Sequence, residues 1–183
     1  AVLSLMIKFK KKHIILLFIF FFLPLAVAVY FSLNYFRKSK KLKKVIVDKP
    51  SLTMRLINYY GDTIYKFPVA VGTNYGNKEK VGDLKTPEGT FPVEGLEDSK
   101  DWKYDFENDG KGPIAGAYGP WFIKLKVQNA SGIGIHGTHE NESIGKRVSH
   151  GCVRMKNEDL LVLVNLVSPG IEVSISPDTV KTK

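Results

Sequence analysis

The stretch SHGCVRM, residues 149–155, contains the single cysteine of this 183-residue chain. Cys152 lies between a histidine–glycine pair, His150 and Gly151, and Arg154, and a second such pair begins at His136. A cysteine that serves only as a small core hydrophobe does not need polar, turn-forming neighbours. A reactive thiol is therefore the favoured interpretation, and a packed, inert thiol with unrelated histidines is the alternative.

The surroundings of Cys152 suit nucleophilic catalysis. Nearby cations and oriented N–H groups lower the pKa of a thiol, and an adjacent glycine lets backbone N–H groups approach an oxyanion. The thiol also needs a base within hydrogen-bond reach. On an extended segment His150 would lie about 7 Å from the thiol, so we favour His136, which ends an apolar run and can face Cys152.

The net charge of +9 belongs to one end of the chain. Of the 27 Lys and Arg residues, ten lie within residues 1–44, where there is no Asp or Glu. The remaining 139 residues therefore carry 17 basic and 18 acidic side chains. We expect no nucleic-acid partner, because the larger part of the chain has no general attraction for polyanions.

The basic residues flank an apolar segment. Residues 1–13 are basic, residues 14–33 contain no charge, and residues 34–44 form a second basic stretch that reads as a tether. Twenty apolar residues are enough to cross a bilayer as a helix. We predict an uncleaved membrane anchor. The alternative is a signal peptide cleaved near Ala28, within the small-residue pattern Ala26-Val27-Ala28.

The pattern beyond the tether predicts a mainly β domain over residues 45–176, followed by a tail at 177–183. Short Val-, Ile- and Tyr-rich runs are broken by turns, as in a sandwich or mixed sheets. One helix is expected after the cysteine, with Asn157 as its cap and acidic residues in its first turn. Residues 94–120 read as a long loop, and a loop of this length in a small domain is often functional.

The motif set resembles the L,D-transpeptidase family, whose catalytic unit is the YkuD-type domain. The matching residues are His136-Gly137-Thr138 and Ser149-His150-Gly151-Cys152-Val153-Arg154, with the cysteine 16 residues after the first histidine. Residues 86–91, TPEGTF, resemble the family's T-P-x-G-x-F, and the resemblance extends over roughly residues 45–176. It implies a YkuD-like fold with one packed helix after the cysteine.

The resemblance also implies roles for individual residues. Cys152 would be the nucleophile, His136 its general base, and the Gly137 carbonyl the group that orients the imidazole. The N–H groups of Gly151 and Cys152 would form the oxyanion hole. Substrate contacts would come from the following side chains: Ser149, His150, Arg154, Tyr118 and Trp121.

The implied activity is a cysteine-dependent cross-linking of peptidoglycan stem peptides outside the cytoplasm, through a thioester, with release of D-alanine and formation of a 3→3 link. We expect a monomer, sensitivity to carbapenems and no cofactor. No metal is expected, because His136 and His139 lack a convincing third ligand. Alternatives with the same site are an L,D-carboxypeptidase and an enzyme that links proteins to peptidoglycan or detaches them. A non-catalytic wall-binding protein is the alternative of a different class.

Overall fold

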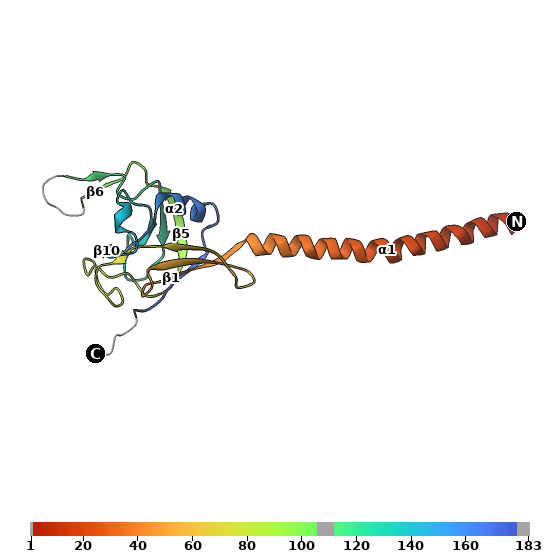
Figure 1. Cartoon of the computed structure of the whole chain (residues 1–183), viewed down its shortest axis with the longest axis horizontal. Helices are drawn as coiled ribbons and strands as arrows, with labels where there is room; N and C mark the ends of the chain where they lie inside the picture. The colour runs from red at the N-terminus through yellow and green to blue at the C-terminus, as the bar shows by residue number, and fades with distance from the viewer. Residues whose placement is uncertain (1, 106–111, 179–183) are drawn as a thin grey trace. The chain divides into compact units, whose positions relative to one another are not determined.

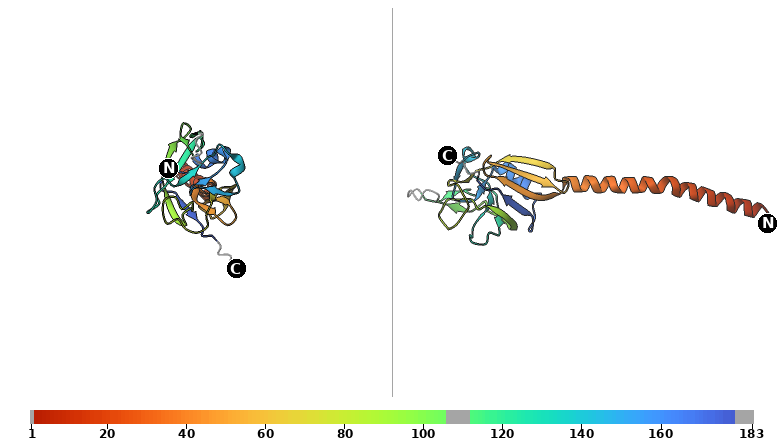
Figure 2. Two further views of the ribbon diagram at one scale, coloured as in Figure 1. Left: turned by 90° about the vertical axis from the view of Figure 1, so that its left-hand side faces the viewer. Right: turned by 90° about the horizontal axis from the view of Figure 1, so that it is seen from below.

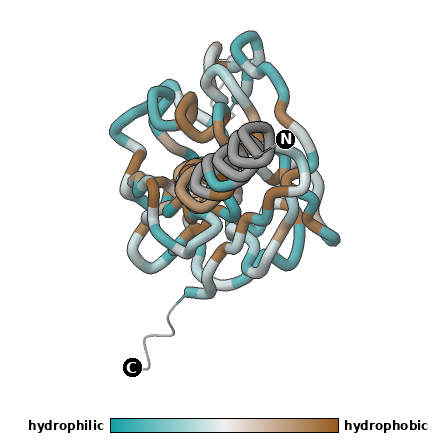
Figure 3. Tube along the Cα trace, turned by 90° about the vertical axis from the view of Figure 1, so that its right-hand side faces the viewer, coloured by the Kyte–Doolittle hydropathy of each residue, from teal (hydrophilic) through white to brown (hydrophobic). Residues whose placement is uncertain are grey.

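The structure is a computed structural model that describes residues 2–105 and 112–178, and these residues form two compact units, at residues 1–40 and 41–183. The first unit is one helix, α1 (Val2–Lys40). Its apolar part, Ile19–Lys40, is long and hydrophobic enough to cross a membrane, with a mean hydropathy of 1.9. In Figure 3 the coloured part of this helix includes brown, hydrophobic residues. A transmembrane helix tolerates an internal proline such as Pro24.

The second unit begins earlier than expected. Strand β1 (Leu42–Asp48) starts three residues before the predicted boundary at Val45, and α1 extends to Lys40 through most of the predicted tether. Alternation explains the early start, because Leu42, Val45 and Val47 are buried while Lys43 is exposed. Only Lys41 separates the helix from the strand.

Within the described residues, the β-rich unit contains eleven further strands, several of which can be followed in Figures 1 and 2. They are β2 (Thr53–Asn58), β3 (Thr63–Pro68), β4 (Val71–Gly72), β5 (Gly89–Asp98), β6 (Lys103–Tyr104), β7 (Ile114–Ala115), β8 (Trp121–Leu125), β9 (Gly134–His136), β10 (Arg147–Ser149), β11 (Val153–Arg154) and β12 (Glu172–Ile175). A 3₁₀ turn, η1 (Asn141–Ser143), and the helix α2 (Asn157–Val164) complete it.

The main sheet has eight strands in the order β11-β9-β8-β5-β12-β1-β2-β3 and is mixed. β1 pairs in parallel with β12, and β9 pairs in parallel with β11, while the other neighbours are antiparallel. Two short pairs, β10-β4 and β6-β7, lie outside this sheet. The mainly β class with one helix after the cysteine is therefore confirmed.

The core lies between the curled sheet and α2. Leu160 and Leu163 of α2 are completely buried, at the i, i+3 spacing that places two side chains on one helix face. They join one apolar cluster with residues from β1, β2, β8, β9, β11 and β12. The same packing covers the strands that carry His136 and the residues after Cys152.

Asn157 does not cap α2 as predicted. The helix begins at Asn157 itself, its N-cap is Lys156, and no side chain caps it. The Asn157 Oδ1 atom instead accepts a hydrogen bond of 3.0 Å from the N–H of Thr138, in the turn after β9. The predicted loop at 94–120 is also partly ordered, because β5 continues to Asp98 and β6 pairs with β7. Residues 106–111 of that loop lie outside the described residues.

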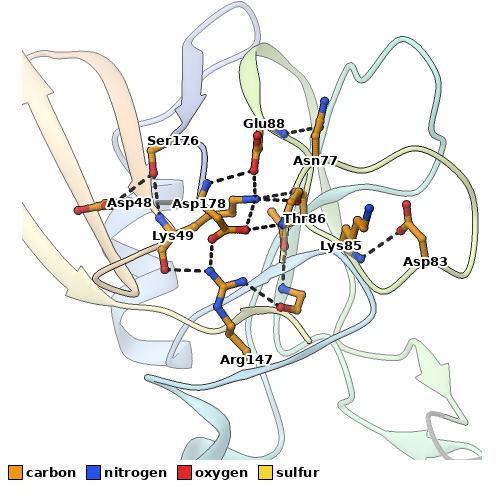
Figure 4. A network of polar contacts seen from close by, with 12 residues as sticks. Asp48, Lys49, Asn77, Asp83, Lys85, Thr86, Glu88, Arg147, Ser176 and Asp178 are labelled. Atoms are coloured by element: carbon orange, nitrogen blue, oxygen red, sulfur yellow. Dashed lines mark hydrogen bonds and ion pairs between the residues drawn. The ribbon is translucent and has the colours of Figure 1, made fainter. Parts of the chain in front are cut away.

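A buried lysine, Lys49, connects the segment after β12 with the end of β1 (Figure 4). Lys49 is fully buried, and its Nζ lies 2.7 Å from Glu88 Oε1 and 3.0 Å from Asp178 Oδ2. Asp178 also pairs with Arg147 of β10 and accepts the N–H of Gly76 at 2.7 Å. A buried charge is tolerated only when it is paired and hydrogen-bonded. The network therefore ties the segment after β12 to β10, which leads into the SHGC stretch.

Thr86 of the TPEGTF stretch makes a second link. Its hydroxyl accepts the N–H of Gly72 in β4 at 2.7 Å, and Thr73 donates its N–H to the Ser149 carbonyl at 3.0 Å. A Cβ on Gly72 would lie 2.5 Å from the Leu84 carbonyl oxygen, so only glycine fits there. The stretch thus holds β4 in place, and β4 in turn holds β10.

We predict that Lys49→Met lowers the free energy of unfolding by about 3 kcal/mol, because removing one partner of a buried ion pair leaves an uncompensated charge. Denaturant unfolding of the detergent-solubilised chain measures this change. Lys43→Met, at an exposed position of β1, the strand that ends just before Lys49, is the matched control and should stay within about 0.5 kcal/mol of the wild type. Equal effects of the two substitutions would contradict a special role for Lys49.

Candidate active site

Cys152 and His136 are brought together by the parallel pairing of β9 and β11. The register pairs Val153 with Ile135 and Arg154 with His136. Cys152, one residue before β11, therefore lies beside the first residue of β9, and Arg154, two residues later, pairs with His136. The Cys152 Sγ is 3.3 Å from the Gly132 carbonyl oxygen, just upstream of β9. Both residues line one cavity of about 310 Å³.

Burial dominates the acidity of the thiol. It raises the pKa of Cys152 above its ordinary value, and this effect outweighs the lowering by the Gly134 N–H and by the charges of Arg154 and Lys78. The lowering of the thiol pKa that the sequence led us to expect from cations and N–H groups is therefore present but smaller than the effect of burial. The thiol rests neutral and needs a base at the moment of attack.

His136 is suited to be that base. Its imidazole is buried, and Nδ1 lies 2.6 Å from the Gly137 carbonyl oxygen. A carbonyl can only accept a hydrogen bond, so Nδ1 carries the proton and Nε2 keeps its lone pair. Burial lowers the pKa of His136 to about 3, more than the Gly137 hydrogen bond raises it. The neutral, proton-accepting form is therefore the resting form at neutral pH.

Aromatic rings pack around the imidazole. Phe122 stacks on His136 with ring centroids 5.8 Å apart and planes at 16°, and Tyr118 lies at 4.8 Å. Burial raises the pKa of Tyr118 to about 12, so its phenol keeps its proton. These rings restrict the imidazole to one orientation and keep water from its faces.

The turn after His136 has no room for a side chain. A Cβ on Gly137 would lie 2.1 Å from Asn157 Oδ1 and 3.0 Å from the Gly119 Cα. The same Asn157 oxygen accepts the Thr138 N–H. Gly137 is therefore held between the start of α2 and Gly119, and its carbonyl is fixed against the imidazole.

The SHGC turn is held by its own serine. Ser149 Oγ donates to the Cys152 carbonyl at 2.6 Å and accepts the Gly151 N–H at 3.1 Å. Gly151 has a φ of +134°, and a Cβ there would lie 2.9 Å from the Lys85 carbonyl oxygen, so glycine is required. The Gly151 N–H could join an oxyanion hole only by exchanging its bond to Ser149.

The other predicted contact residues separate into two groups. Ser149, His150, Arg154 and Tyr118 line the cavity with Cys152 and His136. Arg154 is buried. Desolvation lowers the pKa of His150, so the His150 imidazole is neutral, like that of His136. Trp121 does not line the cavity, which contradicts its predicted place in the groove. It packs against the hydrophobic core, because side chains alternate along β8 and Phe122, its neighbour, takes the face toward His136.

Sequence reasoning missed three residues of the site. Phe122 stacks on the base, Asn157 holds the turn after it, and Lys78 lines the cavity. Tyr104 also lines the cavity, with its ring 6.3 Å from that of His150. Strand alternation could have indicated Phe122. No sequence signal distinguished Lys78 from the other charged residues of its loop.

Within the described ranges, 2–105 and 112–178, no group of three or more His, Cys, Asp or Glu side chains is placed to hold a metal ion. The chemistry that the site itself offers is acyl transfer by a cysteine with a fixed imidazole base.

Comparison with known proteins agrees with this geometry. A sequence model described as the L,D-transpeptidase catalytic domain matches residues 42–175. The chain belongs to the L,D-transpeptidase family. The matched range includes every strand of the β-rich unit and α2.

Individual L,D-transpeptidases support the assignment. The chain is 34% identical over 135 residues to the putative L,D-transpeptidase YkuD of Bacillus licheniformis, covering 73% of this chain and 66% of that protein. It is 32% identical over 132 residues to the putative YkuD of Bacillus subtilis, covering 72% and 63%. The chain thus spans about two thirds of the length of these curated relatives.

Solved structures show the same fold. The helical cell shape determining protein Pgp2 of Campylobacter jejuni matches with a TM-score of 0.56 and 20% identity, over 75% of this chain and 48% of that one. The catalytic domain of the E. faecium L,D-transpeptidase matches with a TM-score of 0.52 and 22% identity, over 73% and 95%. The β-rich unit therefore corresponds to nearly all of a catalytic domain studied on its own.

The depressed pKa of His136 predicts a pH-dependent stability. Below pH 6.5 the unfolded chain binds a proton at this imidazole and the folded chain does not, so stability falls as the pH falls toward 3. Between pH 6.5 and 4 this linkage amounts to about 3 kcal/mol. His136→Asn should lose less stability than the wild type over this range in denaturant unfolding, and both should be flat from pH 7 to 8. Parallel curves below pH 6.5 would contradict the buried neutral imidazole.

Proposed function

We propose that this chain is a peptidoglycan L,D-transpeptidase that forms 3→3 cross-links through a thioester on Cys152 and releases D-alanine. The observation that carries the proposal is the pairing of a neutral thiol with a buried imidazole whose Nδ1 is held by the Gly137 carbonyl. Family membership narrows the acyl transfer to stem peptides. A proton-accepting Nε2 in the same cavity as the thiol is what the first step needs.

In the first half-reaction, His136 Nε2 takes the Sγ proton as sulfur attacks the carbonyl carbon of the third, L-configured residue. The tetrahedral intermediate collapses as the imidazolium returns that proton to the departing amine. The C–N bond breaks, D-alanine leaves, and a thioester remains on Cys152. The energy of the cleaved bond is kept in the thioester, so no nucleotide is consumed.

In the second half-reaction, the side-chain amine of another stem's diamino acid attacks the thioester carbonyl. His136 accepts a proton from this amine and delivers it to the departing sulfur. An amide bond forms, the C–S bond breaks, and the thiol is restored. Attack by water instead would give an L,D-carboxypeptidase with the same residues, and the same chemistry would serve attachment or detachment of wall-linked proteins.

Electrostatic support for the oxyanion would come from backbone N–H groups of the SHGC turn. The Cys152 N–H is the first candidate. The Gly151 N–H would join it by leaving Ser149, a change that rotates one peptide. Arg154, His150 and Tyr118 would contact the stem from the walls of the cavity, and Ser149 would keep the turn in shape.

The N-terminal helix supports an extracytoplasmic placement. We propose that α1 anchors the chain in the cell membrane as a single span, with the β-rich unit on the outer side as a monomer. Cleavage near Ala28 would release the same unit. In either case the cavity would meet stem peptides outside the cytoplasm.

We predict that the wild type converts a disaccharide-tetrapeptide to a 3→3 dimer with loss of D-alanine, and that Cys152→Ala forms neither product nor thioester. Mass spectrometry of the reaction reads both species. His136→Asn should lower turnover by about a hundredfold or more, the size of a general-base contribution. Trimmed tripeptide without dimer would reassign the chain as a carboxypeptidase, and identical traces for wild type and Cys152→Ala would refute the proposal.

Intact-mass measurement with a carbapenem gives a further test of the thiol. The wild type should gain the mass of one carbapenem, and Cys152→Ala should gain none. Labelling of both proteins, or of neither, would contradict a reactive Cys152.

A further inference from the structure

The loop at residues 78–85 is organised around one carboxylate. Asp83 Oδ2 accepts the N–H groups of Glu79 and Lys80 at 2.7 and 3.1 Å, and Oδ1 accepts that of Lys85 at 3.1 Å. Figure 4 shows the bond between Asp83 and Lys85. Leu84 is held at a φ of +57°, a conformation that non-glycine residues adopt only when their surroundings impose it. The loop therefore has one defined shape.

That shape places the ammonium of Lys78 at the nucleophile. Lys78 Nζ lies 2.8 Å from Asp83 Oδ1, and only 5% of its side chain is exposed. A Cβ on Gly151 would lie 3.3 Å from Nζ, so the ammonium sits next to the backbone just before Cys152. Val81, Gly82 and Leu84 of the same loop line the cavity with Lys78.

The charged side chains that line the cavity are cationic. Lys78 and Arg154 line it, while His136 and His150 are neutral. None of its lining residues in the described ranges is Asp or Glu. Asp83 pairs with Lys78, and Glu140 acts electrostatically on Arg154. An ammonium has three N–H donors, of which the bond to Asp83 uses one. The site is therefore suited to an anion beside the reacting sulfur.

We propose that Lys78 is a substrate-binding residue that makes this enzyme prefer a stem peptide with a free carboxylate near the scissile bond over the same stem with that group amidated. The preference rests on the proposed function. An ammonium forms a charge-assisted hydrogen bond with a carboxylate and gains the attraction of opposite charges, whereas an amidated group offers it no negative charge. Asp83 acts as the positioning residue for this ammonium.

A pair of alkylating agents tests anion binding without a peptidoglycan substrate. Iodoacetate and iodoacetamide attack the same thiol with the same leaving group and differ in charge. The fraction of thiolate cancels in the ratio of their rates, so the ratio reports only how the site treats the anion. Lys78→Met should lower the iodoacetate-to-iodoacetamide ratio about tenfold, and Lys78→Arg should retain most of it.

Lys80→Met is the matched control, because Lys80 is exposed on the same loop and its side chain does not line the cavity. Its ratio should equal that of the wild type. An unchanged ratio in Lys78→Met, with both rates lowered alike, would overturn the proposal and leave Lys78 as a group that only stabilises the thiolate. Lys78→Met should keep the fold, because Asp83 retains three backbone donors, and its denaturation midpoint checks this.

The substrate arm uses a free-acid tetrapeptide stem and its side-chain-amidated form. The wild type should turn over the free acid about tenfold faster, and Lys78→Met should turn over both at similar rates. Equal selectivity in the two proteins would overturn the assignment of the carboxylate to Lys78. Turnover of neither stem by the wild type would refute the proposed function instead, while the alkylation ratio would still decide whether Lys78 binds an anion.

Discussion

The active site depends on the parallel pairing of two very short strands. β9 and β11 share only two residue pairs, Val153 with Ile135 and Arg154 with His136. A shift of one residue in a strand turns every side chain to the opposite face, so this register alone decides whether the thiol meets the imidazole. Further backbone hydrogen bonds made by β11 and by the residue after it stabilise this register. Met155 donates its N–H to the His136 carbonyl at 3.0 Å, and Arg154 exchanges backbone hydrogen bonds with Ala70.

The sequence indicated the candidate catalytic residues more readily than the residues that line the cavity. Cys152 and His136 are candidates from residue types and spacing alone, whereas the role of Gly137 came only from the resemblance to the L,D-transpeptidase family. The walls depend on which face of a strand a side chain takes and on how loops fold back. Trp121 and Phe122 differ by one position, and only the observed pairing of β8 with β9 shows that Phe122 faces the imidazole. In the sequence nothing separates Lys78 from the other lysines of its loop. In the structure Lys78 pairs with Asp83 and lines the cavity.

The fold class was predictable from the sequence, but the side-chain contacts between residues far apart in the chain were not. Alternating apolar residues indicated strands, and the apolar run after Asn157 indicated the helix. The sequence could not show that a lysine, Lys49, would be completely buried, because burial requires Glu88 and Asp178 to arrive from distant parts of the chain. Asn157 likewise looked like a helix cap, a local role, whereas its partner Thr138 lies 19 residues away.

The raised pKa of Cys152 has a consequence for the lifetime of the enzyme. Peroxides oxidise the thiolate form of cysteine to sulfenic acid far more readily than the protonated form. A chain with one cysteine has no second thiol to reverse that damage by forming an internal disulfide. Burial favours the protonated thiol, and in the proposed reaction His136 would remove this proton only when substrate is bound, so Cys152 would be protected from oxidation between encounters with substrate.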